Sequence, residues 1–134
     1  MNYELLYFDV HYSEGDWDYL RVVMHHEFYH NIEEYLYGSS YYKDPAWDAL
    51  NDAAFEYGSG GAACYTSMPV LQPGFVSAYA MCGLEEDKAE TFGYLMTDKN
   101  KAEIEDMMQT DPILKNKIDY MVEEMRGLGL VITL

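Results

Sequence analysis

The sequence predicts a single α+β domain that is predominantly helical. Its 134 residues are enough for one hydrophobic core. Four long segments carry apolar residues at helical spacing, and one segment near the N-terminus alternates as a strand does. Hydrophobic residues make up 49% of the chain and aromatic residues 16%, which is typical of a folded protein. We therefore expect residues 1–134 to form one domain, a small β element followed by a helical body.

The β element is predicted at residues 3–12. Leu6, Phe8, Val10 and Tyr12 alternate with their neighbours there, and the residue types favour a strand. A turn follows at residues 13–16, where Ser13 or Asp16 can cap the next element.

The first long helix is predicted at residues 17–37, with Gly38 as its C-cap. Apolar residues recur along it at helical spacing and predict the face that packs on the core: Leu20, Met24, Phe28, Ile32, Tyr35 and Leu36. His26, Glu27 and His30 point towards other faces. The helix is therefore expected to be apolar on one face and to present polar side chains on another.

The segment from residue 39 to residue 73 is mixed. Asp44 is expected to open a short helix with Pro45 at its first position. The glycine-rich loop at residues 56–61 lacks the Lys and the helix of a phosphate-binding loop, so it has no predicted nucleotide role. Residues 75–80 are expected to be extended. We expect Cys64 and Cys82 to be free thiols, with one disulfide as the alternative.

The C-terminal part of the chain is predicted to form a helical subdomain. Helices are expected at residues 84–96, 100–109 and 111–126, and residues 128–134 form a last strand or a tail. The helix at 84–96 begins with several acids, which the helix dipole favours. The apolar sides are formed by Ala89, Phe92, Leu95 and Met96 in this helix and by Ile113, Leu114, Ile118, Met121, Val122 and Met125 in the last helix.

The charge of the chain limits its partners. Lys and Arg total 8 against 24 Asp and Glu, a formal net charge of −16, so a nucleic acid is not an expected partner, whereas a cationic peptide would be attracted. No apolar run reaches the ~20 residues of a membrane-spanning helix. Residues 1–4 lack the pattern of a signal peptide. The compartment stays open, because a fragment or mature form of a secreted protein would look the same, and the oligomeric state is not predicted.

The chemistry is concentrated at residues 26–30, which read H-E-x-x-H. Residues four apart lie on one face of a helix, so His26 and His30 can bind one zinc ion. Glu27 then lies beside the metal, where it can take a proton from a zinc-activated water.

A hydrolytic zinc site needs a third protein ligand. A metzincin would continue with Gly and His at positions 33 and 36, but these are Glu33 and Leu36, which excludes that class. His25 points about 100° away from His26 on the helix. His11 lies on the predicted strand without a supporting pattern.

The gluzincin alternative takes the third ligand from a Glu on a second helix, and the helix at residues 84–96 is the expected donor. On spacing alone, the candidates are Glu85, Glu86, Asp87 and Glu90. Glu86 and Glu90 lie one turn apart, so one can bind zinc while the other accepts a hydrogen bond from a ligating imidazole.

The two motifs together resemble the catalytic domain of anthrax lethal factor and its relatives. They also resemble a group of bacterial zinc metallopeptidases with an E-D-x-A-E-x-F helix, present here at residues 86–92. In lethal factor a Tyr precedes the third zinc ligand by seven residues and a second Glu follows it by four, as Tyr79 and Glu90 do around Glu86. The resemblance covers most of residues 20–126. The chain is short for such a domain, so part of the sheet before the first helix is expected to be missing.

The resemblance implies a zincin-like fold and a gluzincin-type zinc metallopeptidase that acts on a peptide or protein. It implies His26, His30 and Glu86 as zinc ligands, with Glu90 in hydrogen-bonding support. Glu27 would be the general base and Tyr79 would face the oxyanion. One alternative is a metal-binding but catalytically degenerate interaction domain, and another is an acidic, metal-free partner-binding domain. The presence of Glu27 argues against the first, because a structural zinc site has no use for a base.

Overall fold

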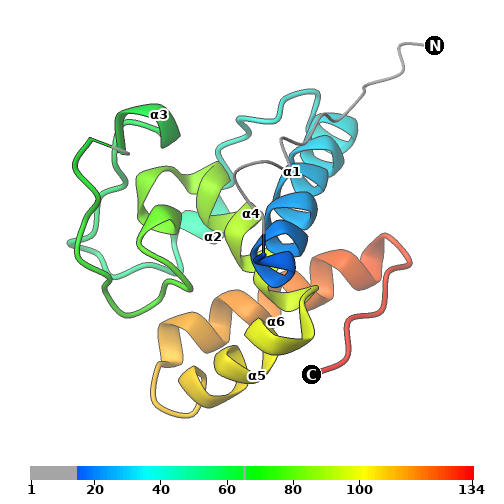
Figure 1. Ribbon diagram of the computed structural model, residues 1–134. Helices are drawn as coiled ribbons and strands as arrows, with labels where there is room; N and C mark the ends of the chain where they lie inside the picture. The colour runs from blue at the N-terminus through cyan, green and yellow to red at the C-terminus, as the bar shows by residue number, and fades with distance from the viewer. Residues whose placement is uncertain (1–14, 65) are drawn as a thin grey trace.

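The computed structural model describes residues 15–64 and 66–134, and all regular structure in these two ranges is helical (Figure 1). The strand predicted at residues 3–12 lies outside the described residues. The elements are α1 (Trp17–Tyr37), α2 (Pro45–Asp48), α3 (Gly61–Cys64), the 3₁₀ helix η2 (Tyr79–Cys82), α4 (Leu84–Leu95), α5 (Asp98–Met107) and α6 (Pro112–Gly127). In these ranges no helix combines the length and the apolar character that crossing a membrane requires.

The helices begin and end close to the predicted positions, because the capping residues that the sequence contains are used. Asp16 accepts a hydrogen bond from the backbone N–H of Tyr19 at the start of α1, and Gly38 ends that helix with a φ of 72°. Asp44 and Asp111 cap α2 and α6 in the same way, each ahead of a proline.

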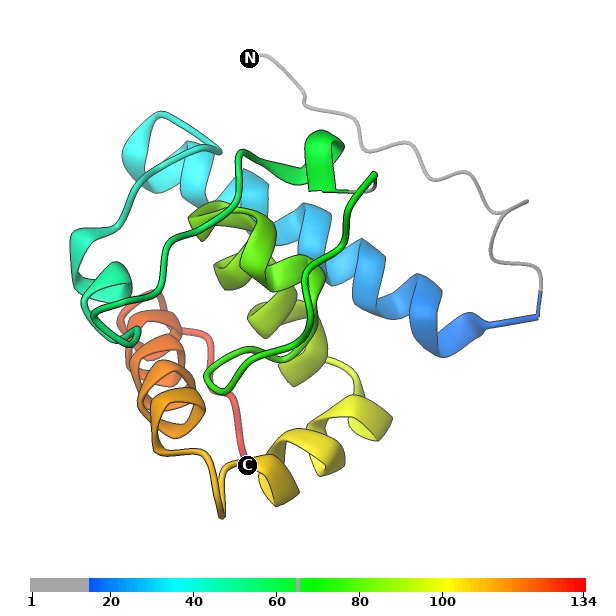
Figure 2. The same ribbon diagram turned by 90° about the vertical axis from the view of Figure 1, so that its left-hand side faces the viewer.

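Helix α4 lies at the centre of the molecule and packs along α1 (Figures 1 and 2). The close approach depends on Gly93. A Cβ at this position would lie 2.7 Å from the backbone oxygen of Val22 and 3.4 Å from the backbone nitrogen of His26. Glycine therefore allows the backbone of α4 to reach the segment of α1 that carries His26.

The predicted apolar sides of α4 and α6 are confirmed. Ala89, Phe92 and Leu95 are buried in α4, and α6 contributes Leu114, Ile118, Met121 and Met125 to the same core. Burial of these side chains is the main stabilising contribution to the fold.

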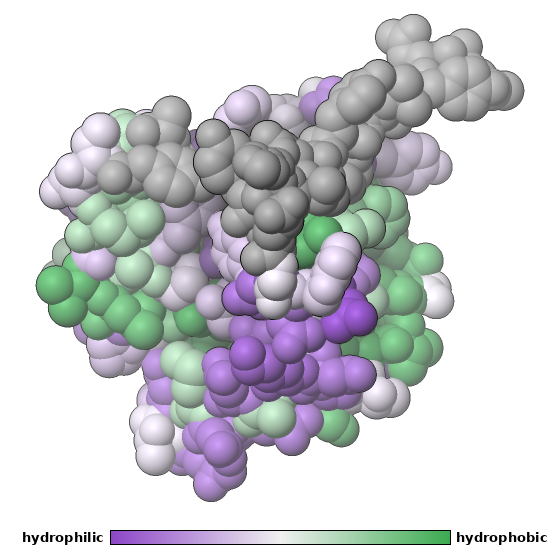
Figure 3. Space-filling view, viewed as in Figure 1, coloured by the Kyte–Doolittle hydropathy of each residue, from purple (hydrophilic) through white to green (hydrophobic). Residues whose placement is uncertain are grey.

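The predicted core face of α1 is wrong for most of its length. Met24 is 44% exposed and Phe28 51% exposed, whereas the buried residues of α1 are Leu20, Val22, His26, Tyr29 and Glu33. The apolar stripe instead lines a surface groove with the chain that follows α6, and apolar surface lies beside α1 in Figure 3. The reason is that α4 offers α1 polar partners, so the polar face of α1 turns inward.

The expectation of an extended segment at residues 75–80 is wrong, because the chain bends at residues 76–77 and enters η2 at Tyr79. Of the two alternatives for residues 128–134, the structure shows the tail, and Leu130 and Ile132 from this tail pack against the core.

The expectation of two free thiols is wrong, since Cys64 and Cys82 form a disulfide with their Cα atoms 5.7 Å apart. The loop before α3 runs along η2 and brings the two residues together. The backbone N–H of Gly58 donates to the carbonyl of Met81 over 3.0 Å, and that of Gly60 donates to the carbonyl of Cys82 over 2.9 Å. Helix α3 is thereby fixed against η2.

Buried ion pairs fix the rotation of α4 about its own axis. The Nζ of Lys88 lies 3.0 Å from Asp44, 3.2 Å from Glu124 and 3.5 Å from Glu33. Asp87, which directly precedes Lys88, accepts hydrogen bonds at Oδ2 from three side chains: Lys117, Trp47 and Tyr57. With Asp87 and Lys88 held on one side of α4, Glu86 and Glu90 face α1.

Candidate metal centre

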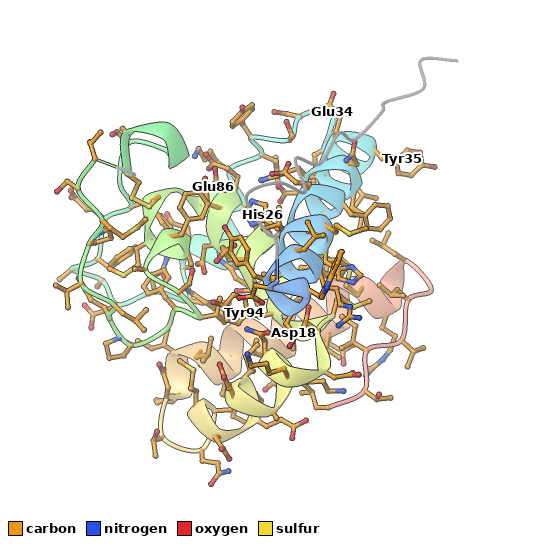
Figure 4. All side chains as sticks on the ribbon, viewed as in Figure 1. Asp18, His26, Glu34, Tyr35, Glu86 and Tyr94 are labelled. Carbon is orange, nitrogen blue, oxygen red and sulfur yellow. A yellow bond between two sulfur atoms is a disulfide. The ribbon has the colours of Figure 1, made fainter. Side chains whose placement is uncertain are left out.

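Three potential metal ligands converge between α1 and α4, and Figure 4 shows His26 and Glu86 pointing into this space. The Nε2 atoms of His26 and His30 lie 3.2 Å apart. The Oε2 atom of Glu86 lies 3.1 Å from Nε2 of His26 and 3.7 Å from Nε2 of His30. Ligand atoms around a tetrahedral zinc ion, at bonds of 2.0–2.1 Å, lie about 3.3 Å apart. The group could therefore hold a metal ion without large rearrangement.

The hydrogen bonding of these side chains fits a metal better than a purely structural role. Glu86 Oε2 is buried and, among the described residues, has no hydrogen-bond partner with acceptable geometry. Nδ1 of His30 has no partner among them either. Buried polar atoms are normally paired, so the unpaired Oε2 of Glu86, which lies between the Nε2 atoms of two imidazoles, indicates a ligand site.

Glu90 supports the first histidine from behind. Its Oε1 lies 2.9 Å from Nδ1 of His26, and its Oε2 accepts a 2.6 Å hydrogen bond from the hydroxyl of Ser77. When Nδ1 carries the proton and donates to Glu90, the lone pair of Nε2 points to the centre of the site. This is the hydrogen-bonding arrangement expected for Glu90 from the sequence.

The carboxylates around His26 favour a proton at the position where a metal cation would bind. Burial disfavours the imidazolium of His26, but the carboxylates of Glu86 and Glu90 outweigh burial and raise the pKa of His26 to about 9. Burial also disfavours the charged form of Glu86, but His26 and His30 outweigh it and lower the pKa of Glu86 to about 2. A divalent metal would displace this proton and satisfy the same carboxylate.

Glu27 and Tyr79 line the same cavity as the three ligands. The cavity has a volume of about 290 Å³, and its wall includes Ser40 and Tyr41 from the loop after α1. Glu27 is half-buried, and the ring of Tyr79 lies 6.0 Å from that of His26. Glu27 and Tyr79 thus both lie beside the candidate ligands, as expected.

The structure shows which acid of α4 can be the third metal ligand, a choice that sequence spacing alone does not make. Glu85 is turned away and pairs with Lys43, and Asp87 is buried on the opposite side of the helix. Only Glu86 of the four joins the group that could hold a metal. The ring of His25 packs against that of Phe92, away from this group, and His11 lies outside the described residues.

Residues that the sequence did not point to also form the site, namely Ser40, Tyr41, Gly61 and Ser77. A Cβ at Gly61 would lie 2.2 Å from the hydroxyl oxygen of Tyr79 and 2.7 Å from Oε1 of Glu86, so any other residue there would displace the ends of these two side chains. The glycine-rich loop at residues 56–61 is the one signal for this part of the site, but a loop pattern does not reveal which side chains approach it. Ser40, Tyr41 and Ser77 reach the site through chain turns for which the sequence gives no periodic pattern.

Comparison with known proteins identifies a family. The family described as "Putative zinc-binding metallo-peptidase" matches residues 3–126. Searches of curated proteins and of solved structures returned no match. The match spans both helices of the candidate site and includes every residue that lines the cavity. The chain therefore belongs to this zinc-binding metallopeptidase family.

Proposed function

We propose that the protein is a gluzincin-type metallopeptidase in which His26, His30 and Glu86 bind zinc and Glu27 acts as the general base. The observation that carries the proposal is the convergence of the three ligand atoms in a cavity that Glu27 and Tyr79 also line. Zinc bound there would lower the pKa of a water to about 7 and polarise a peptide carbonyl.

Glu27, Tyr79 and Glu90 have separate roles in the proposed hydrolysis. The carboxylate of Glu27 takes the proton of the attacking water and passes it to the leaving amine. The Tyr79 hydroxyl donates a hydrogen bond to the carbonyl oxygen as it gains negative charge, a contribution of about 3 kcal/mol in comparable sites. Glu90 keeps His26 in the tautomer whose Nε2 faces the cavity. These roles agree with the resemblance to lethal factor noted in the sequence.

The test combines metal content with peptidase activity. We expect purified wild type to bind one zinc ion and Glu86→Ala to bind none under the same supply. Glu27→Gln should keep zinc but lose 10²- to 10⁴-fold in the rate of cleavage of a peptide mixture followed by mass spectrometry. Glu105→Gln, an exposed acid on α5, serves as the matched control and should behave as wild type.

Three outcomes would count against the proposal. Wild type without zinc at micromolar supply would exclude a zinc enzyme. Full activity in Glu27→Gln would show that Glu27 is not the base. Zinc binding without cleavage of any peptide would favour the catalytically degenerate alternative.

A further inference from the structure

Ser77 lies at the junction between the two parts of the candidate site. Its hydroxyl donates to Oε2 of Glu90 over 2.6 Å and accepts from the backbone N–H of Ala80 over 3.1 Å. Glu90 belongs to α4 and contacts His26, whereas Ala80 belongs to η2, the short helix that begins at Tyr79. One hydroxyl group therefore contacts both the carboxylate behind a candidate ligand and the turn that carries Tyr79.

The contact with Glu90 fixes both oxygens of that carboxylate. Oε1 is held by Nδ1 of His26 and Oε2 by Ser77, so the carboxylate plane cannot rotate without breaking a hydrogen bond. A hydrogen bond to an ionised acceptor is roughly twice as strong as one between neutral groups. The orientation of the His26 ring consequently depends on Ser77 through Glu90.

The contact with Ala80 fixes the start of η2. The first residues of a helix have backbone N–H groups without an intrahelical partner. The residue before η2, Ala78, provides no side-chain cap, and Ser77 satisfies the N–H of Ala80 instead. The position of Tyr79 along the cavity therefore depends on the same hydroxyl.

We propose that Ser77 is a positioning residue that couples the orientation of His26 to the position of Tyr79. This inference rests on the proposed function, since it assumes that His26 binds zinc and that Tyr79 faces the reacting carbonyl. Ser77 is not part of the wall of the cavity that Glu27 shares with His26, His30 and Glu86. It lines a neighbouring cavity with His26, Glu27 and Tyr79 instead, so its effect on the ligand atoms is indirect.

The first measurement is metal affinity, with zinc alone as the probe and a chromogenic chelator as competitor. Ser77→Ala should bind zinc several-fold to ten-fold more weakly than wild type, within the range seen when outer hydrogen-bond partners of ligands are removed. The absorption spectrum of the cobalt-substituted protein should shift, because the His26 ring changes its orientation. Ser77→Thr, which keeps the hydroxyl, should restore both, and exposed Ser67→Ala should change neither.

The second measurement is a pair of double-mutant cycles. In the Glu90→Ala background, Ser77→Ala should cause no further loss of zinc affinity, because its path to His26 is already broken. In the Tyr79→Phe background, the part of the kcat loss that Ser77→Ala causes through Tyr79 should disappear, with KM little changed throughout.

The outcomes separate this inference from the proposed function. A wild type that binds no zinc overturns the proposed function. A wild type that binds zinc, with Ser77→Ala equal to it in affinity and cobalt spectrum, overturns the role of Ser77 alone. Equal losses from Ser77→Ala with and without Glu90, or a Thr variant as weak as the Ala variant, would also overturn it.

Discussion

The two sides of α4 carry neighbouring acids of one motif with opposite surroundings. Asp87 and Lys88 face the core, and two buried lysines, Lys88 and Lys117, lie against the acids on that side. Glu86 and Glu90 face His26 and His30, where no Lys or Arg among the described residues pairs with them and the only ion-pair partners are histidines. The core side is balanced by cations of the chain itself, whereas the histidine side is suited to a cation from outside.

The difference shows how buried charge can be interpreted. A buried acid that meets a lysine needs no further partner and holds helices together. A buried acid that meets only imidazoles, with ligand atoms close to zinc spacing, is left with bonding capacity for a metal. The same short sequence, residues 86–90, therefore serves stability on one side and the candidate chemistry on the other.

The largest expected effect is on the core side. Asp87→Ala should lower the free energy of unfolding by about 3–5 kcal/mol, because it leaves the charge of Lys117 and the donors of Trp47 and Tyr57 without their acceptor. Urea denaturation should give this loss with and without zinc. Asp119→Ala, an exposed acid on α6, should cost under about 1 kcal/mol. A mild, zinc-dependent loss in Asp87→Ala would erase the distinction between the two sides.

Zinc should stabilise the protein only through the histidine side. At a free concentration of 100 times its Kd, zinc should add about 2.7 kcal/mol to the stability of wild type, because it binds the folded state alone. The same zinc concentration should add nothing to Glu86→Ala. Thermal or urea unfolding with and without zinc measures both. Equal stabilisation of the two proteins would place the metal elsewhere.

Glu33 tests the charge balance of the core side, where it is the third carboxylate around Lys88. Burial raises the pKa of Glu33 from 4.5 to about 8, although Lys88 partly opposes the shift. The folded protein thus keeps a proton on Glu33 between these values that the unfolded chain releases, so stability falls as the pH rises through this range.

Glu33→Gln should remove this pH dependence. We expect wild type to lose on the order of 2 kcal/mol relative to Glu33→Gln between pH 5 and pH 7.5. Denaturation curves of both proteins at several pH values, with the metal chelated, test this. If the stability of the two proteins changes with pH in the same way, Lys88 keeps Glu33 ionised over the whole pH range.

The smallest expected effect concerns the wall of the cavity. Gly61→Ala would place a methyl group against the Tyr79 hydroxyl and Glu86, so peptidase activity should fall about ten-fold, equivalent to about 1.4 kcal/mol. Gly127→Ala is the matched control, since a Cβ there meets nothing within 4 Å. Kinetics on one peptide substrate would compare them. Equal activity in both variants would show that the added methyl group is accommodated without disturbing Tyr79 or Glu86.

Local chemistry made most of the helices predictable. Asp16, Asp44 and Asp111 cap helices, and Gly38 ends one, because each acts on backbone groups within a few residues of itself. The pairing of His26 with His30 also follows from one turn of helix. The sequence could thus indicate where α1, α2 and α6 begin and that two histidines share a face.

The face that each helix buries was less predictable. Hydrophobicity placed Met24 and Phe28 in the core, but the structure buries His26 and Glu33. A hydrophobic pattern does not record that a partner helix offers Lys88, Glu86 and Glu90 as polar partners. The disulfide escaped prediction for a similar reason, because two cysteines give no spacing pattern.

The sequence by itself determined the approximate bounds of the long helices α1, α4, α5 and α6, the histidine pair and the set of acids from which a third ligand could come. Only the tertiary structure decided that Glu86 faces the histidines, that Glu90 and Ser77 lie behind His26, and that Gly61 forms the wall beside Tyr79. The physical reason is the distance in sequence over which each interaction acts. Caps and helical periodicity act over one turn, whereas the rotation of α4 is fixed by ion pairs between residues at least 30 positions apart.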